Sequence, residues 1–224
     1  MFGRLIRFVA FPALAILAGL LFLNPDSGLA AMGPIPDPSV DVPVTPGTQT
    51  AVLAGGCFWC SEAVFDHVKG VKKVVSGFAG GTKETAHYEV VSAGNTDHAE
   101  SIQITYDPAQ ISYGTILKVF FGVAHDPTTL NRQGPDWGKQ YRSAIFYSNE
   151  DQKRVAEAYI KQLDEAQIFK KPIVTQVVPL KGFYPAEAYH QNYVALHPEN
   201  PYVRVNSLPK LSKLAKTFPD LYKK

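Results

Sequence analysis

The stretch Ala51-Val52-Leu53-Ala54-Gly55-Gly56-Cys57-Phe58-Trp59-Cys60, residues 51–60, decides how the chain folds around its two cysteines. Its first four residues form a short apolar run, which predicts a buried strand, and Gly55-Gly56 predicts a tight turn after it. Residues 61–69 place apolar side chains on one helical face, and Gly70 ends that pattern. Cys57 is therefore expected where a strand gives way to a helix.

The rest of the chain continues this alternation of strands and helices. Apolar runs bounded by turn residues predict strands over 71–79, 101–106, 143–147 and 173–180. Helical spacing of apolar side chains predicts helices over 112–123 and 150–167. Such alternation predicts a pair of layers in which helices pack on a sheet.

Composition limits the class of protein. The chain has 224 residues, enough for one domain or at most two small ones. It is 46% hydrophobic and 19% charged, which indicates a folded chain. A net charge of +2 argues against a nucleic-acid binder. The two cysteines are too few for a disulfide-rich scaffold or a four-thiolate zinc site.

The first 30 residues have the pattern of a signal peptide. Arg4 and Arg7 precede an apolar run over 8–23, which is shorter than the roughly 20 residues of a membrane span. Small residues before Ala31 suit cleavage after Ala30. We therefore expect an exported protein, with an uncleaved membrane anchor as the alternative for this segment.

Three further regions are expected after the signal segment. Residues 31–49 are rich in proline and are predicted to form an extended linker. Residues 50–205 are the folded domain. Residues 206–224 form a basic tail, expected to be a solvated arm wrapped on the domain, with binding to acidic partners or anionic lipid as the alternative.

The spacing of Cys57 and Cys60 predicts redox or nucleophilic chemistry. Backbone N–H groups at a helix start stabilise a thiolate. A structural disulfide is the alternative, but closing four residues contributes only about 2 kcal/mol, against about 3 for fifteen. Zinc is disfavoured because His190 and His197 are too widely spaced for usual ligands. A thioredoxin-like site is also disfavoured, because aromatic residues lie between the cysteines, where they suit an apolar pocket.

The segment Gly56-Cys57-Phe58-Trp59 resembles the active-site signature of the A-type peptide methionine sulfoxide reductases. The resemblance covers about residues 50–205. The further matching motifs are Gly77-Phe78-Ala79-Gly80-Gly81, Tyr88-Glu89-Val90-Val91, His98-Ala99-Glu100, Tyr106-Asp107-Pro108, His125-Asp126-Pro127-Thr128, Asn131-Arg132-Gln133-Gly134, Asp136, Gln140-Tyr141-Arg142-Ser143, Phe183-Tyr184-Pro185-Ala186-Glu187 and Tyr189-His190-Gln191.

The resemblance implies a role for each matching residue. Cys57 is expected to attack the sulfoxide sulfur of methionine S-sulfoxide, and Glu100 to protonate the sulfoxide oxygen. Tyr88 and Tyr141 are expected to bind that oxygen, Asp136 to organise the site through water, and Phe58 and Trp59 to hold the substrate methyl group. Taken singly, Glu100 fits a solvated surface acid, Asp136 a turn residue and the tyrosines packing residues; the ordered set of motifs outweighs these interpretations.

The resemblance also implies the fold and the partners. The fold class expected is α+β, a two-layer α/β sandwich with a mixed sheet and a ferredoxin-like core. Substrates would be oxidised proteins or free methionine sulfoxide, and a thioredoxin-like dithiol would supply electrons. No metal, cofactor or nucleic acid is expected, and we expect a monomer.

The sequence departs from the family pattern in ways that affect the mechanism. Cys60 stands where glycine is common, and the resolving cysteines that many members carry near the C-terminus are absent here. We therefore predict a Cys57–Cys60 disulfide as the oxidised product. Asp97 also replaces a common glycine. Two other functions stay open: an exported thiol–disulfide oxidoreductase, and a non-catalytic domain with a C-x-x-C staple and a partner-binding basic tail.

Overall fold

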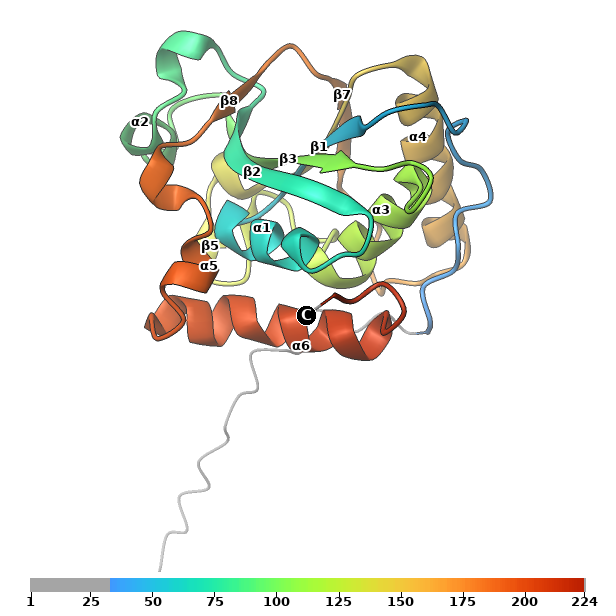
Figure 1. Cartoon of the computed structure of the whole chain (residues 1–224). Coiled ribbons are helices and arrows are strands. Elements are labelled where there is room, and N and C mark those ends of the chain that lie inside the picture. The colour runs from blue at the N-terminus through green and yellow to red at the C-terminus, as the bar shows by residue number, and fades with distance from the viewer. Residues whose placement is uncertain (1–32, 224) are drawn as a thin grey trace, which may run out of the picture.

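The computed structural model describes residues 33–223 (Figure 1). The expected signal segment and the first two residues of the linker lie outside this range. Among the described residues, none of the helices has the length and apolar character needed to cross a membrane.

A mixed six-stranded sheet forms the centre of the domain. Its order is β7-β6-β1-β3-β2-β8, and β6 and β7 pair in parallel while the other neighbours are antiparallel. The strands are β1 (Gln49–Gly55), β2 (Val71–Ala79), β3 (Ala99–Tyr106), β6 (Ser143–Tyr147), β7 (Gln176–Pro179) and β8 (Phe183–Pro185). A separate hairpin joins β4 (Arg132–Gln133) to β5 (Asp136–Trp137). The expected α+β class with a mixed sheet is thus confirmed.

Helices surround this sheet. They are α1 (Phe58–Asp66), α2 (Tyr88–Ser92), α3 (Tyr113–Val119), α4 (Glu150–Glu165), α5 (Tyr193–Leu196) and α6 (Leu208–Thr217). Two π-helical turns, Phe120–Ala124 and Val203–Ser207, continue α3 and precede α6. Single 3₁₀ turns occur at Lys83–Thr85, Lys139–Tyr141 and Ala188–His190.

Most long elements lie where the sequence predicts them, with shifts that have local causes. The strands predicted over 71–79 and 143–147 coincide with β2 and β6. The helix expected from residue 61 begins at Phe58, because the carbonyl of Cys57 already accepts the amides of Cys60 and Ser61 at 3.2 and 3.4 Å. The helix expected over 112–123 is divided between α3 and its π-helical turn.

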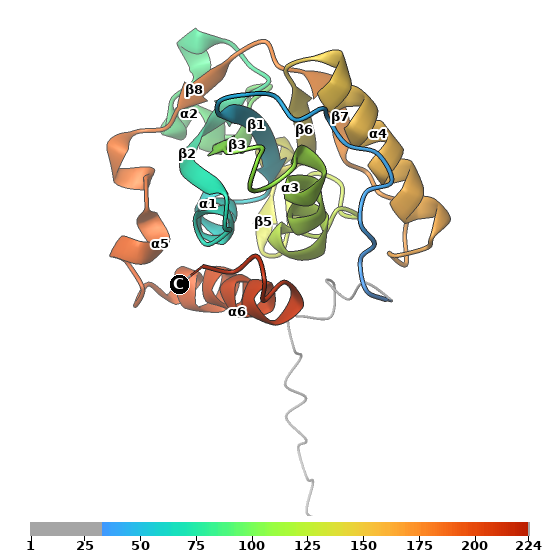
Figure 2. The ribbon, with the colours of Figure 1, turned by 45° about the vertical axis from the view of Figure 1, so that its right-hand side comes forward.

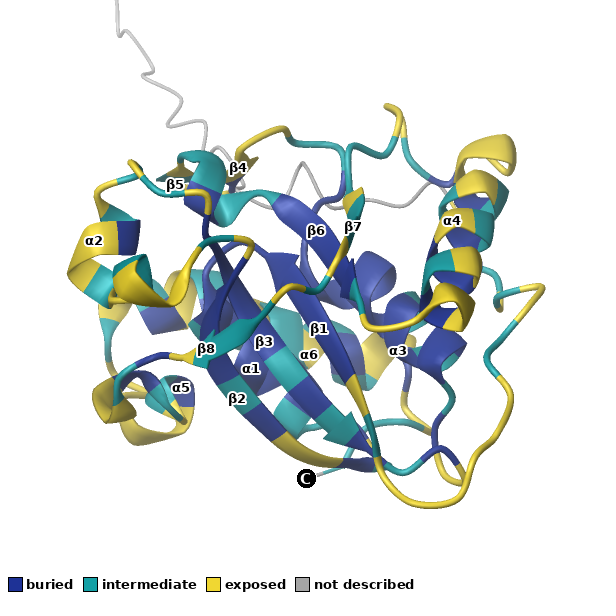
Figure 3. Cartoon of the chain, turned by 90° about the horizontal axis from the view of Figure 1, so that it is seen from above, coloured by how far each residue is buried: buried dark blue, intermediate teal, exposed yellow. Residues whose placement is uncertain are grey.

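Alternate residues of β1 supply the two faces of the sheet. Ala51 and Leu53 join the main core with side chains of α1, α3 and α4, whereas Val52 and Ala54 pack on the opposite face. Because successive side chains of a strand point to opposite sides, one buried strand serves both layers. Figures 2 and 3 show this strand in the middle of the sheet, with α1 and α3 on the same side.

The basic tail expected over 206–224 is instead part of the packed domain. Leu214 is fully buried and Phe218 is 9% exposed, and both belong to the main core. Figure 1 shows α6 lying across the domain beside α1. The spacing of Leu211, Leu214 and Phe218 gives this segment an apolar stripe that must be covered. The packed domain therefore continues past the boundary expected at residue 205.

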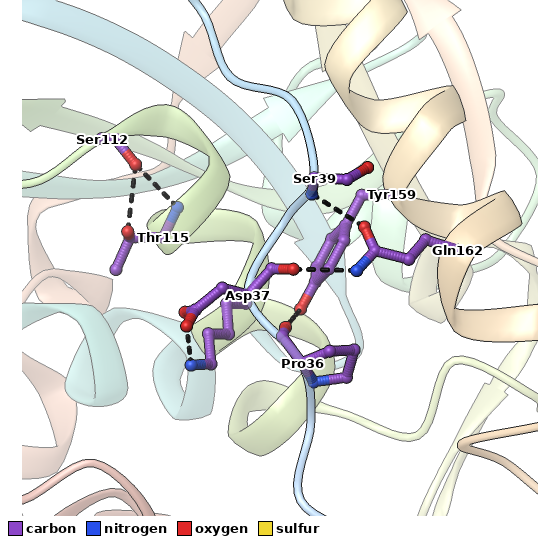
Figure 4. A network of polar contacts seen from close by, with 8 residues as sticks. Pro36, Asp37, Ser39, Ser112, Thr115, Tyr159 and Gln162 are labelled. Atoms are coloured by element: carbon purple, nitrogen blue, oxygen red, sulfur yellow. Dashed lines mark hydrogen bonds and ion pairs between the residues drawn. The ribbon is translucent and has the colours of Figure 1, made fainter. Parts of the chain in front are cut away.

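The proline-rich segment also lies against the domain, although the sequence predicts an extended linker. Tyr159 of α4 donates a hydrogen bond to the carbonyl of Pro36 at 2.7 Å, and Gln162 donates to the carbonyl of Asp37 at 2.8 Å (Figure 4). Ile35 is 8% exposed and belongs to the main core. Proline removes backbone donors but leaves carbonyl acceptors, and α4 pairs with these acceptors.

Candidate active site

Cys57 lies at the start of α1, directly after the Gly55-Gly56 turn. Gly56 has a φ of +86°, and a Cβ atom on it would overlap the side chain of Gln133. Only glycine satisfies both conditions, because other residues disfavour this φ and carry a Cβ. The turn therefore places Cys57 at the N-cap of α1, where it is 9% exposed.

Glu100 of β3 is buried beside this helix start. Its Oε2 accepts a hydrogen bond from the backbone amide of Phe58 at 3.0 Å, and the residue is 2% exposed. Burial raises the pKa of the Glu100 carboxyl to about 8, with the charges of Asp136 and Cys60 adding to the shift against the Phe58 hydrogen bond. Glu100 is therefore protonated at neutral pH and can donate a proton.

The two cysteine side chains form a hydrogen-bonded pair with both thiols free. The Cys57 hydrogen bond lowers the pKa of Cys60 to about 6, and the charge of Lys210 and a hydrogen bond from Ser207 act in the same direction against burial. The sequence predicts that the helix start stabilises a Cys57 thiolate, but burial instead raises the pKa of Cys57 well above its usual value, and the neighbouring Cys60 adds to this. The two shifts are opposite in direction, so the pair releases its first proton more readily than an ordinary thiol and its second proton less readily.

Cys60 contacts the segment that leads into α6. Its Sγ lies 3.1 Å from Oγ of Ser207 and 3.6 Å from the carbonyl oxygen of Asn206. Lys210, in the first turn of α6, donates a hydrogen bond to the carbonyl of Ala124 at 2.7 Å. The C-terminal segment thus supplies both a hydroxyl and a positive charge to the Cys60 sulfur.

Aromatic side chains beside Cys57 form a fixed wall. Phe58 is buried and Trp59 is half-buried. Nε1 of Trp59 donates a hydrogen bond to Nδ1 of His190 at 3.1 Å, and its ring stacks on Tyr193 with centroids 3.8 Å apart. His190 also packs on Phe58, with ring centroids 5.1 Å apart. These contacts hold the indole in one orientation before substrate binds.

Two tyrosine hydroxyls lie within the electrostatic field of Glu100 and Cys57. Burial raises the pKa of Tyr88 and of Tyr141, and the charge of Glu100 is the next cause for both. Both phenols therefore stay protonated and remain hydrogen-bond donors. The amide of Tyr88, at the start of α2, donates to Oε1 of Glu187 at 3.1 Å, which fixes this residue.

Asp136 of β5 is linked to Cys57 through Tyr202. The Tyr202 hydroxyl donates to Oδ2 of Asp136 at 2.5 Å, and it lies close enough to Cys57 to influence the pKa of that thiol. Burial raises the pKa of Asp136, whereas this hydrogen bond and Lys210 lower it. Tyr202 therefore connects an acidic group to the nucleophilic sulfur.

The structure brings together all the site residues that the sequence predicts. These are Cys57, Phe58, Trp59, Cys60, Tyr88, Glu100, Asp136 and Tyr141. Sequence reasoning missed His190, Tyr193, Tyr202, Ser207 and Lys210. His190 belongs to the matching motif Tyr189-His190-Gln191, which implied no role for it. The other four residues lie outside the motifs that match the family. Across residues 33–223, no three histidine, cysteine or carboxylate side chains are placed to hold a metal ion.

Known proteins are similar in sequence to this chain over most of its length. The model of the family "Peptide methionine sulfoxide reductase" matches residues 49–221. Peptide methionine sulfoxide reductase MsrA 2 of Synechocystis is 54% identical over 214 residues, which are 94% of this chain and 98% of that protein. An MsrA of Thermus thermophilus is 51% identical over 77% of this chain and 97% of its own length.

Solved structures agree with the sequence relatives. Reduced Mxr1 of Saccharomyces cerevisiae superposes with a TM-score of 0.62 at 32% identity, covering 73% of this chain and 94% of that one. Methionine sulfoxide reductase A of Corynebacterium diphtheriae gives a TM-score of 0.58 at 34% identity, covering 69% and 77%. The chain therefore belongs to the family of A-type peptide methionine sulfoxide reductases, the peptide-methionine (S)-S-oxide reductases.

Proposed function

We propose that the chain reduces methionine S-sulfoxide, in proteins or free, through a Cys57 sulfenic acid and a Cys57–Cys60 disulfide. The single observation that carries this mechanism is the pair of buried free thiols next to the buried Glu100 carboxyl, whose pKa is raised to about 8. One thiol attacks, the second resolves, and the carboxyl supplies the proton that the sulfoxide oxygen needs.

The first step of the proposed reaction begins with proton transfer within the cysteine pair. The proton of Cys57 moves to the Cys60 thiolate along their hydrogen bond, and the Cys57 sulfur attacks the sulfoxide sulfur. Glu100 transfers its proton to the oxygen, while Tyr88 and Tyr141 donate hydrogen bonds to it. The substrate S–O bond and the transient bond between the two sulfurs then break as the protonated oxygen moves to the Cys57 sulfur, which releases methionine and leaves a Cys57 sulfenic acid.

The second step releases the oxygen as water and forms the disulfide. The Cys60 sulfur attacks the sulfur of the sulfenic acid, and the departing hydroxide combines with the proton that Cys60 carried. A thioredoxin-like dithiol then reduces the disulfide by two electrons. Its two protons restore the Cys57 thiol and the Glu100 carboxyl, so the cycle balances.

Mass spectrometry tests this sequence of steps. After one equivalent of substrate without reductant, we expect peptide maps to show a Cys57–Cys60 disulfide. In Cys60→Ser the sulfenic acid should accumulate instead, detected by a sulfenic-acid-specific probe. A wild-type product with an oxidised Cys57 and a free Cys60 thiol would exclude the disulfide step.

We also propose that the enzyme acts outside the cytoplasm. The support is the pattern of Arg4 and Arg7 before the apolar run over 8–23. N-terminal sequencing of the protein from a periplasmic or extracellular fraction should give a mature chain that begins at Ala31, or an intact N-terminus in the membrane fraction if the segment is an anchor. Recovery of the full chain in the cytosolic fraction would oppose export.

A further inference from the structure

A basic cleft opens from the two cysteines on the side of α6. It has a volume of about 1110 Å³, and the β4–β5 hairpin, the second π-helical turn and α6 line it. Its charged lining residues are Arg132, Asp136, Arg204, Lys210, Lys213 and Lys216. Five positive charges and one negative charge give the lining a formal charge of +4, with the cysteines counted as neutral. The whole chain carries only +2, so positive charge is concentrated beside the site.

Helix α6 supplies three of these charges from one face. Lys210, Lys213 and Lys216 recur every three residues, so successive turns present them to the cleft. Leu214, one residue beyond Lys213, is fully buried in the core. The same helix that closes the core therefore arranges a row of cations that starts next to Cys60.

Contacts within the protein already hold several of the cations in place, and one of them is the ion pair between Nη1 of Arg204 and Oε2 of Glu199 at 3.8 Å. The guanidinium of Arg132 lies over the Trp137 ring, 4.1 Å from its centroid, and its Nε donates to the carbonyl of Gly134 at 3.0 Å. Lys210 donates to the carbonyl of Ala124 at 2.7 Å. Fixed charges lose little side-chain freedom when a ligand binds. The carboxylate of Asp136, the one acidic group of the lining, accepts a hydrogen bond from Tyr202.

We propose that this cleft binds an acidic segment of an oxidised polypeptide, so that the enzyme prefers methionine S-sulfoxide flanked by aspartate or glutamate. The proposal rests on the proposed function, because the Cys57 sulfur in the cleft is the atom that the sulfoxide must reach. The cleft exceeds the roughly 300–1,000 Å³ typical of small-molecule sites, so it has room for residues beside the methionine. Charge complementarity selects and steers such a segment.

The test compares three peptides that differ only in the residues flanking one methionine S-sulfoxide. These residues are acidic, neutral or lysine, and dithiothreitol serves as reductant so that no protein partner takes part. At low ionic strength we expect kcat/KM to be about fivefold higher for the acidic than for the neutral peptide, and lowest for the lysine peptide. The difference should disappear near about 0.5 M salt.

A matched pair of variants places the effect in the cleft. Lys213→Gln/Lys216→Gln should bring the acidic-to-neutral ratio of kcat/KM close to one. Lys170→Gln/Lys171→Gln removes the same charge from exposed positions outside the cleft and should keep the wild-type ratio. A preference that survives in the first variant, or is lost equally in both, overturns the proposal.

Two further outcomes separate this proposal from others. Equal kcat/KM for the three peptides at low salt overturns it. A variant Lys213→Gln/Lys216→Gln that changes only the KM for a protein dithiol also overturns it, because the cleft then serves the reductant. Failure of the proposed function would look different, since the wild-type enzyme would then not reduce free methionine S-sulfoxide at all.

Discussion

The backbone amide of Phe58 donates a hydrogen bond to Oε2 of Glu100 at 3.0 Å, across 42 positions of sequence. The residue before Phe58 is Cys57, whose own side chain does not cap the helix, so the carboxyl satisfies an amide that the first turn of α1 leaves unpaired. One contact therefore fixes both the helix start that carries the nucleophile and the acid that serves it.

Glu100→Gln should remove the proton donor without removing this hydrogen bond, because the amide oxygen of Gln still accepts from Phe58. We expect kcat/KM to fall about 10²–10⁴-fold, the usual contribution of a general acid. Glu157→Gln, on the exposed face of α4, is the matched control. Steady-state kinetics measures this effect, and thermal unfolding checks that both variants are folded. Wild-type kcat/KM in Glu100→Gln would mean that another group protonates the sulfoxide oxygen.

The pH dependence follows from two groups with shifted pKa values. Activity should rise as the cysteine pair loses the first of its two protons, through the Cys60 pKa of about 6, and fall as Glu100 ionises through its pKa of about 8. Above this pKa the decline should approach tenfold per pH unit. A profile of kcat/KM against pH tests this, and an alkaline decline that persists unchanged in Glu100→Gln would contradict the assignment.

The same raised pKa makes stability depend on pH. Folded Glu100 keeps its proton up to about 8, whereas the unfolded carboxyl releases it near its ordinary value of 4.5. The native state binds more protons between these values, so this group's contribution to stability falls as pH rises through that window. Urea unfolding at pH 5 and pH 8 should show a smaller loss in Glu100→Gln than in the wild type; an equal loss would mean that other groups cause it.

Ser207→Ala should raise the apparent pKa of Cys60 by removing a hydrogen bond to its thiolate. A hydrogen bond to a charged group contributes about 1.5–3 kcal/mol, which corresponds to about one pH unit or more. Alkylation rates of Cys60 against pH, resolved by peptide mapping, measure this. Ser212→Ala, exposed on α6, is the control, and a midpoint that stays near 6 in Ser207→Ala would deny Ser207 this role.

Tyr202→Phe should slow catalysis by about tenfold, because it removes the hydroxyl that joins Asp136 to Cys57. Loss of the donor also leaves the half-buried Asp136 without this partner, which should cost about 1–3 kcal/mol of stability. Tyr147 is a half-buried residue of β6, and Tyr147→Phe is the control for removing a phenol hydroxyl elsewhere in the domain. Unchanged kinetics in Tyr202→Phe would show that the hydroxyl acts on neither group.

Ile35→Ala tests whether the proline-rich segment is part of the fold. Burying Ile35 in the main core predicts a loss of about 2–5 kcal/mol in the free energy of unfolding. Val44→Ala, in the same segment but 70% exposed, should change stability by less than about 0.5 kcal/mol. Equal stability of the two variants in urea unfolding would mean that the segment does not pack on the domain in solution.

The sequence by itself determined the element types around the site and the residues that act there. A buried strand, two glycines and a helix locate Cys57 through local physics, because backbone freedom and hydrophobic period are properties of short segments. The ordered motifs identified Glu100, Tyr88, Tyr141 and Asp136. The same reasoning placed the helix start at Ser61, whereas α1 begins at Phe58. The Glu100 carboxyl that accepts the Phe58 amide lies on a distant strand, so local sequence does not show it.

Only the tertiary structure decided the electrostatics of the site and its surroundings. Tyr202, Ser207 and Lys210 acquire their roles when the C-terminal segment packs beside α1, and no local pattern encodes that contact. The raised pKa of Glu100 likewise depends on burial by side chains from other elements. Desolvation and charge interactions depend on distances in space, so the chain gains a working acid and a Cys60 thiolate only once it has folded.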